Sequence, residues 1–163
     1  SETRFNEYRD AYGLNFGEPL NGGRHYVYVC GSDGNTEGTP DSGKKDISTI
    51  YYMLTNNDIS AFHRLHDMVE IWYYQAGNRL KLHVIDKDGT LTTHFLSPQD
   101  EMQVVIQPEQ WFAAEIADNK GFTLVGCAVG PAFQFDKFEL AKQAELIQAF
   151  PQHRTLIERM CRS

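Results

Sequence analysis

Long apolar runs are absent from this sequence, and basic residues are few. No apolar run approaches the roughly 20 residues that a membrane-spanning helix needs, and the start, SETRFNEYRD, lacks the apolar core of a signal peptide. Fifteen Lys and Arg stand against 22 Asp and Glu, and the net charge of −7 would repel a phosphate backbone. We therefore expect a cytoplasmic protein that binds neither membranes nor nucleic acid.

Cysteine is also scarce. Cys30, Cys127 and Cys161 are widely spaced and lack the Cys-x-x-Cys pairing of zinc sites and redox motifs. We expect three reduced thiols, with Cys30 and Cys127 packed in strands. The rest of the composition is ordinary, because 163 residues with 41% apolar and 23% charged residues suit one soluble domain with a hydrophobic core.

Short runs of β-branched and aromatic residues fill most of the chain, several of them with the period of two expected of strands. Turn-forming Gly, Pro, Asn and Asp separate these runs. The predicted strands are 24–30, 47–54, 60–65, 69–75, 80–85, 91–96, 102–107, 110–116 and 122–129. So many short strands at regular spacing favour a mainly β sandwich or barrel over βαβ units.

Three segments lie outside this pattern. Residues 1–22 form an N-terminal arm without a clean period, and 31–46 have too little apolar content to fold, so they are predicted to be a surface loop. The tail, 136–160, is predicted to be helical. Asp136 and Glu139 have the spacing of a capping box, and apolar residues then recur at helical spacing until a proline ends the first helix.

A hairpin is predicted at Asp88-Gly89. If these two residues form the whole turn, His83 faces His94 across the two strands. A cross-strand metal pair is one interpretation of these histidines. The neighbouring apolar residues would fill the core and leave both histidines outside, so solvated side chains are the expected arrangement.

The stretch from Ser60 to Gly77, SAFHRLHDMVEIWYYQAG, holds the main candidates for chemistry. Alternation sends His63 to one face of its strand and Glu70 to one face of the next. If both faces line a barrel, a carboxylate near an imidazole favours the imidazolium, a pair suited to proton transfer. The alternative is a hydrogen-bonded pair that only orders the barrel.

Aromatic residues surround this predicted pair. Trp72, Tyr74 and Trp111 would form aromatic walls that suit flat or sugar-like ligands. Tyr52 and Tyr74 could each donate a proton from the other side. Buried aromatic residues are more often plain core, and that interpretation stays open.

Four blocks of the sequence resemble the cupin_5 family, also called DUF985. They are STIYYMLT, SAFHRLHDMVEIWYYQAG, VVIQPEQWFAA and LVGCAVGPAFQFDKFELA, in the family's order. The spacing of His63, Glu70 and Gly77 also fits the first cupin motif. The resemblance implies a double-stranded β-helix of cupin type with C-terminal helices, a homodimer, and kinship with predicted sugar epimerases.

The chain departs from metal-binding cupins at two positions. Leu65 and Ala113 stand where such cupins have histidines, so that His63 and Glu70 are what remains of four ligands. We therefore expect no metal and no other cofactor, and rank a metal-dependent dioxygenase last.

Two functions remain open. The first is an isomerase or epimerase that acts on a keto-sugar or sugar nucleotide, with His63 as the base, Glu70 orienting it, and Tyr74 or Tyr52 returning a proton. In this hypothesis Trp72 and Trp111 bind the ligand. The alternative is a non-catalytic cupin that has lost its metal and keeps a pocket for a small ligand.

Overall fold

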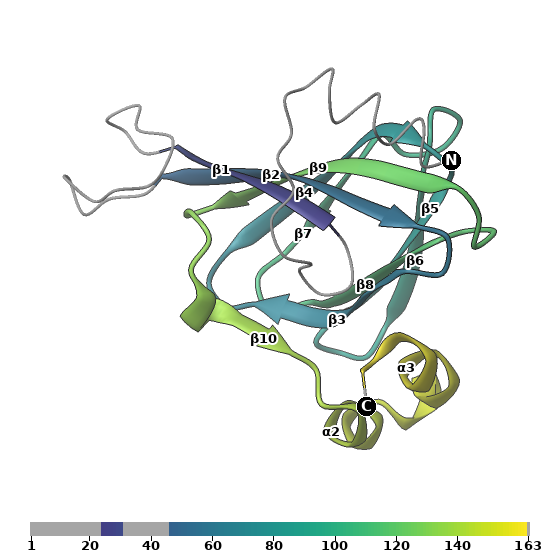
Figure 1. Cartoon of the computed structure of the whole chain (residues 1–163). Coiled ribbons are helices and arrows are strands. Elements are labelled where there is room, and N and C mark those ends of the chain that lie inside the picture. Colours follow the sequence, from purple (N-terminus) through teal and green to yellow (C-terminus); the bar gives the residue numbers. More distant parts are fainter. Residues whose placement is uncertain (1–23, 31–45, 163) are drawn as a thin grey trace.

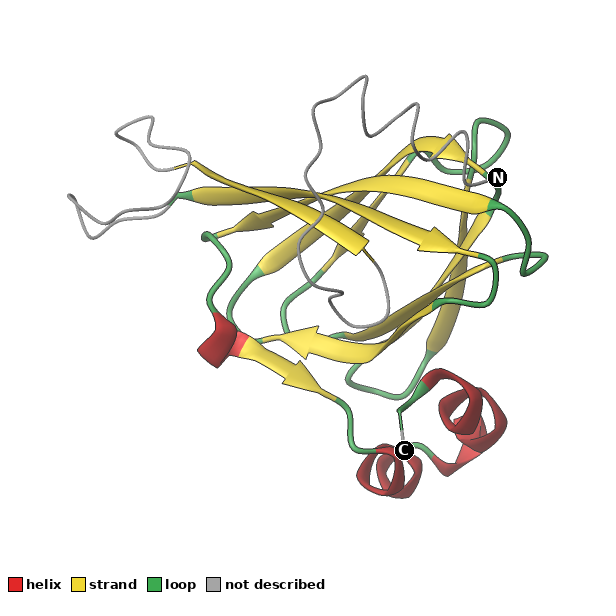
Figure 2. Ribbon diagram, in the orientation of Figure 1, coloured by secondary structure: helices red, strands yellow, loops and turns green. Residues whose placement is uncertain are grey.

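The computed structural model describes residues 24–30 and 46–162. The predicted N-terminal arm and all but the last residue of the predicted loop at 31–46 lie outside the described residues. Two antiparallel five-stranded sheets face each other (Figures 1 and 2). The strands of the first sheet are, in spatial order, β1 (Arg24–Cys30), β2 (Ile47–Thr55), β9 (Phe122–Gly130), β4 (Val69–Gly77) and β7 (Gln103–Ile106).

The second sheet carries the C-terminal helices. Its strands are β10 (Phe138–Leu140), β3 (Ile59–Leu65), β8 (Trp111–Ile116), β5 (Leu80–Ile85) and β6 (Leu91–Leu96). The 3₁₀ helix η1 (Phe135–Lys137) precedes β10, and α2 (Gln143–Ala149), η2 (Pro151–His153) and α3 (Arg154–Met160) follow it. The predicted mainly β class and all nine predicted strands are confirmed, with ends that differ by two residues or fewer.

The two largest of four apolar clusters in the described residues follow from the alternation along the strands. The larger core lies between the sheets and includes Tyr52, Trp72, Leu82, Phe112 and Cys127. A smaller core lies between the outer face of the second sheet and the helices, where Phe62, Ala113, Ile157 and Met160 are buried. Because the inward and outward faces of β8 are both covered, five of its six residues are buried.

The predicted start of the C-terminal helix is wrong. Residues 138–140 form the extended strand β10, which pairs with β3 through Glu139 opposite Arg64. No side-chain hydrogen bond caps η1 or α2. The open edge of β3 offers backbone hydrogen bonds to this segment, and pairing there overrides the local helix signal.

The predicted hairpin register is also wrong. The Asp86 N–H donates to the Thr90 carbonyl at 2.9 Å, so the loop has three residues rather than two. Gly89 closes it with a φ of +86°, a value that glycine adopts without strain. His83 therefore pairs with Thr93, and His94 pairs with Leu82.

The one-residue change in register sends the two histidines to opposite faces of the sheet. His83 is buried beneath the C-terminal helices rather than solvated, since only 5% of it is exposed. His94 shares the inward face with Leu82 at the barrel end, where it contacts Glu101.

Candidate functional site

A bulge in β3 turns His63 toward the space between the sheets. Ser60 pairs with Ala114 and His63 pairs with Phe112, so three residue steps on β3 match two on β8. The extra residue reverses the alternation, and both Ser60 and His63 share a face with inward residues of β8. His63 lies 4.0 Å from the ring of Phe112, centroid to centroid, and 5.4 Å from that of Phe138.

His63 is neutral in this setting. Nδ1 lies 2.7 Å from the carbonyl oxygen of Ala61, which can only accept, so Nδ1 carries the proton and Nε2 the lone pair. Burial lowers the pKa of His63 to about 4, although the bond to Ala61 opposes this change. At neutral pH the ring therefore offers a base.

Glu70 is neutral as well. It pairs with Ile106 and Val129 on the two neighbouring strands, and 8% of it is exposed. Burial raises the pKa of Glu70 to about 8, and the nearby Trp72 indole opposes this rise in part. The structure therefore differs from the expected ion pair: no hydrogen bond or salt bridge between His63 and Glu70 is present among the described residues, and each favours its uncharged form.

Tyr52, Trp72 and Phe112 form a connected aromatic wall between the two groups. The Trp72 ring lies 5.7 Å from that of Tyr52 and 6.1 Å, edge on, from that of Phe112. Nε1 of Trp72 is buried close enough to the Glu70 carboxyl group to oppose the rise in its pKa, but it makes no hydrogen bond of standard geometry in the described part of the chain. Such an unsatisfied donor is costly, and a ligand oxygen would satisfy it.

The two candidate tyrosines have different hydrogen-bond partners. Burial raises the pKa of Tyr52 well above its ordinary value, and a hydrogen bond with Ser60 opposes this rise in part. The phenol thus keeps its proton at neutral pH. The hydroxyl of Tyr74 donates to the carbonyl of Gly77 at 2.7 Å, which directs it toward the end of the barrel.

Trp111 does not lie in the barrel, contrary to expectation. It packs on the outer face of the second sheet, with the guanidinium of Arg64 4.3 Å above its ring. The inward aromatic side chain of β8 is its neighbour Phe112, which the sequence prediction missed. Cys127 was missed as a site neighbour too; burial raises the pKa of its thiol, and the nearby Glu70 adds to this rise. Neighbouring residues of a strand point to opposite faces, so Trp111 and Phe112 cannot both point inward. Assigning the inward face of β8 to Phe112 would have identified it from the sequence.

The donor set does not fit a cupin-type metal. Leu65 packs with Met68 and Val129, and Ala113 faces the helices, while the inward residue beside it is Ala114. Within 46–162, no group of three or more His, Cys, Asp or Glu side chains is placed to hold an ion. Because a cupin-type metal needs three or four such ligands, His63 and Glu70 do not form a metal centre by themselves.

Two antiparallel sheets that enclose an apolar interior, with His63 and Glu70 buried between them, are the arrangement of a cupin-type barrel. The sequence profile of Cupin_5, described as Cupin superfamily (DUF985), matches residues 13–141, so the chain belongs to this family. In the described ranges, no helix has the length and apolar character needed to cross a membrane.

Solved structures support the same fold. Protein SO0799 from Shewanella oneidensis is 28% identical, with a TM-score of 0.81 and 96% of each chain covered. A hypothetical protein from Leishmania major is 25% identical, with a TM-score of 0.76, covering 97% of this chain and 98% of that one. Oxalate decarboxylase from Bacillus subtilis, at 10% identity and a TM-score of 0.60 over 91% of this chain and 37% of its own, shares the fold alone. No curated protein matches the chain.

Proposed function

We propose that this cupin binds a small carbonyl compound in its barrel and acts as an isomerase or epimerase on a keto-sugar or sugar nucleotide. The observation that carries the proposal is the opposite displacement of two pKa values in one apolar interior. Burial lowers the pKa of His63 to about 4 and raises that of Glu70 to about 8. A base and an acid are thus available together at neutral pH.

Each group has a role in moving a proton on the carbon next to a carbonyl. Nε2 of His63 takes the proton from carbon, and the carboxyl group of Glu70 gives its proton to the carbonyl oxygen, so that a neutral enediol forms. Return of the His63 proton to the neighbouring carbon, with Glu70 taking the proton of the other hydroxyl, gives the isomer. Epimerisation needs a proton on the opposite face: Tyr74 or Tyr52 gives it, Glu70 takes back the hydroxyl proton, and the tyrosinate recovers its proton from the His63 imidazolium through water. The N–H of Trp72 donates a hydrogen bond to a ligand oxygen.

The test is incorporation of deuterium from heavy water into a panel of keto-sugars and sugar nucleotides, followed by NMR. We expect carbon-bound deuterium with the wild type and a loss of at least about a hundredfold in the rate for His63→Gln and Glu70→Gln. His94→Gln is the matched control, since this histidine lies at the barrel end and bonds to Glu101. No deuterium in any sugar of the panel would overturn the catalytic proposal.

A second function, ligand binding without catalysis, is favoured by the low pKa of His63. A base whose pKa is about 4 removes only an acidic proton, so a ligand could bind without exchange. In that case calorimetry would detect binding of keto-sugars, and Glu70→Gln would weaken this binding. No deuterium would enter the ligand from heavy water.

We also propose that the chain is a cytoplasmic homodimer. Cys127 and Cys161 are buried free thiols, which suit a reducing compartment. Phe135 is 76% exposed and Leu140 is 40% exposed on or beside β10, the end strand of the second sheet among the described residues, and a second copy would cover them.

A further inference from the structure

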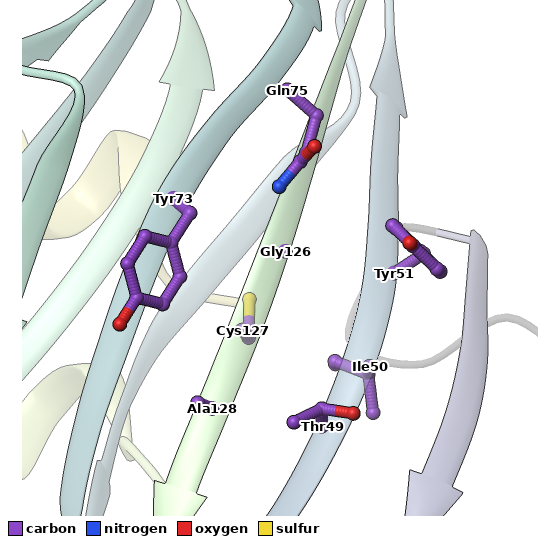
Figure 3. A pocket seen from close by; sticks show the side chains of 8 residues that line it. All are labelled: Thr49, Ile50, Tyr51, Tyr73, Gln75, Gly126, Cys127 and Ala128. Atoms are coloured by element: carbon purple, nitrogen blue, oxygen red, sulfur yellow. The ribbon is translucent and has the colours of Figure 1, made fainter.

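A trough of about 360 Å³ lies on the outer face of the first sheet, on the opposite side of β9 from the barrel interior. Figure 3 shows its walls: Tyr73 and Gln75 stand on β4, and Thr49 and Tyr51 stand on β2, with β9 between them. The pairing places Tyr51 and Tyr73 on either side of Gly126. Two strand spacings separate these walls, which is about 9.6 Å.

The floor of the trough is low because β9 has small residues there. Gly126 has no side chain, and Ala128 follows it on the same face between Thr49 and Ile71. A bulge between Tyr74 and Ala76 leaves Gln75 unpaired in the ladder and turns its side chain over Gly126. The trough thus results from the small side chains of β9 and not from a gap between strands.

Among the described residues, the lining combines aromatic surface with polar groups and has no acidic or basic side chain. Thr49, Tyr73 and Gln75 make no side-chain hydrogen bonds with other described residues, so their hydroxyl and amide groups can bind a ligand. The volume lies at the lower end of the range for small-molecule sites, roughly 300–1,000 Å³. A charged ligand would lose its hydration without gaining a counter-charge.

We propose that this trough binds an uncharged ring with an apolar face and hydrogen-bonding edges, either a neutral sugar or a neutral heteroaromatic base. The ring stacks between the tyrosine walls beside the Gln75 amide, which covers Gly126, and its edge bonds to that amide and to the hydroxyl of Thr49. Ile50 and Cys127 also line the trough, but they pack in the core between the sheets, whereas Tyr73 and Gly126 pair on the opposite face, so the trough lies across the first sheet from the proposed barrel site.

The experiment is saturation-transfer NMR on the full chain at millimolar ligand, with one panel of neutral mono- and disaccharides and a second of adenine, uracil and related free bases. Transfer to either panel supports the site and identifies its ligand class. Tyr73→Ala removes a wall, and Ala128→Leu fills the trough without removing any contact. We expect both variants to bind at least about tenfold more weakly.

Val105→Ala is the matched control, since this residue is exposed on the same face of the neighbouring strand β7 and lies outside the trough. Glu70→Gln should leave this binding unchanged, which separates it from ligand binding in the barrel. The proposal is overturned if neither panel shows transfer, or if Tyr73→Ala and Ala128→Leu bind like the wild type. It is also overturned if light scattering shows that both variants have dissociated a dimer, because lost association would then explain the weaker binding.

Discussion

The protonation of Glu70 ties the stability of the fold to pH. Its pKa is about 8 in the folded chain and 4.5 as the ordinary value, so the folded state holds the proton more tightly. The stability this contributes is fully present below pH 4.5 and is lost as the pH rises toward 8. His63 acts in the other direction, because its lowered pKa makes the folded state less stable as the pH falls below 6.5.

Glu70→Gln should remove the loss of stability on the alkaline side. Gln resembles the protonated carboxyl group in shape but does not ionise. From pH 6.5 to 8, we expect the free energy of unfolding of the wild type to fall by about 2 kcal/mol relative to that of the variant. Urea unfolding followed by tryptophan fluorescence at several pH values measures this difference. Glu145→Gln, on the exposed side of α2, should follow the wild type. Parallel curves for the wild type and Glu70→Gln would show that Glu70 is not held protonated.

At this scale the sequence predicts Glu70 and Trp72 better than His63. Simple alternation places both residues of β4 on the inward face, as observed. His63 reaches the interior through a bulge, and no residue in SAFHRL marks where the extra residue falls. The ionisation states were not predictable, since they depend on how completely neighbouring strands remove water from each group.

A chain of polar groups centred on the buried Glu115 ties α3 to the second sheet. Nδ1 of His83 is hydrogen-bonded to the hydroxyl of Thr93, and Nε2 donates to Glu115, both at 2.8 Å. Arg159 of α3 donates to the other oxygen of Glu115. Burial raises the pKa of Glu115, but the bonds from His83 and Arg159 outweigh it and hold the pKa at about 2.

Glu115→Gln should loosen this contact, because glutamine has no negative charge and offers one acceptor oxygen where the arginine and the histidine now bond to two. We expect the free energy of unfolding to fall by about 3 kcal/mol and the amides of α3 to exchange faster with solvent. Glu158→Gln is the control: it lies on the same helix and breaks an exposed pair with Arg154, at a cost below about 1 kcal/mol. Equal effects of the two substitutions, in urea unfolding and hydrogen exchange, would contradict this role for Glu115.

The nine sequence-predicted strands were found, but the details of turns and ends were not. Asp88-Gly89 does mark the hairpin, yet one more residue in its loop moves His94 from the predicted outer face to the inner face, while His83 stays on the outer face. The capping box at Asp136 competes with the edge of β3, and the backbone pairing of β10 prevails. Both outcomes depend on contacts distant in sequence, which local patterns do not contain.

Across the whole molecule, β10 joins the proposed dimer seam to the proposed barrel site. Phe138 packs 5.4 Å from the His63 ring, and Leu140 on the same strand is exposed. Phe133 and Phe135 stack edge to face at 5.1 Å just before this strand. A second copy on this surface would therefore hold the strand that packs against His63.

Phe135→Glu tests the homodimer by placing like charges at a two-fold seam. Because Phe135 is already 76% exposed, the monomer should fold normally, while two added carboxylates facing each other oppose association. We expect light scattering to give the mass of two chains for the wild type and of one chain for the variant at the same concentration. Gln99→Glu, in the exposed turn between β6 and β7, adds the same charge away from β10 and should remain dimeric.

A monomeric wild type would contradict the homodimer itself, whereas a dimeric Phe135→Glu would place the seam on another surface. If the variant is monomeric and also loses the barrel activity that Gln99→Glu retains, association at β10 supports the position of His63 through Phe138.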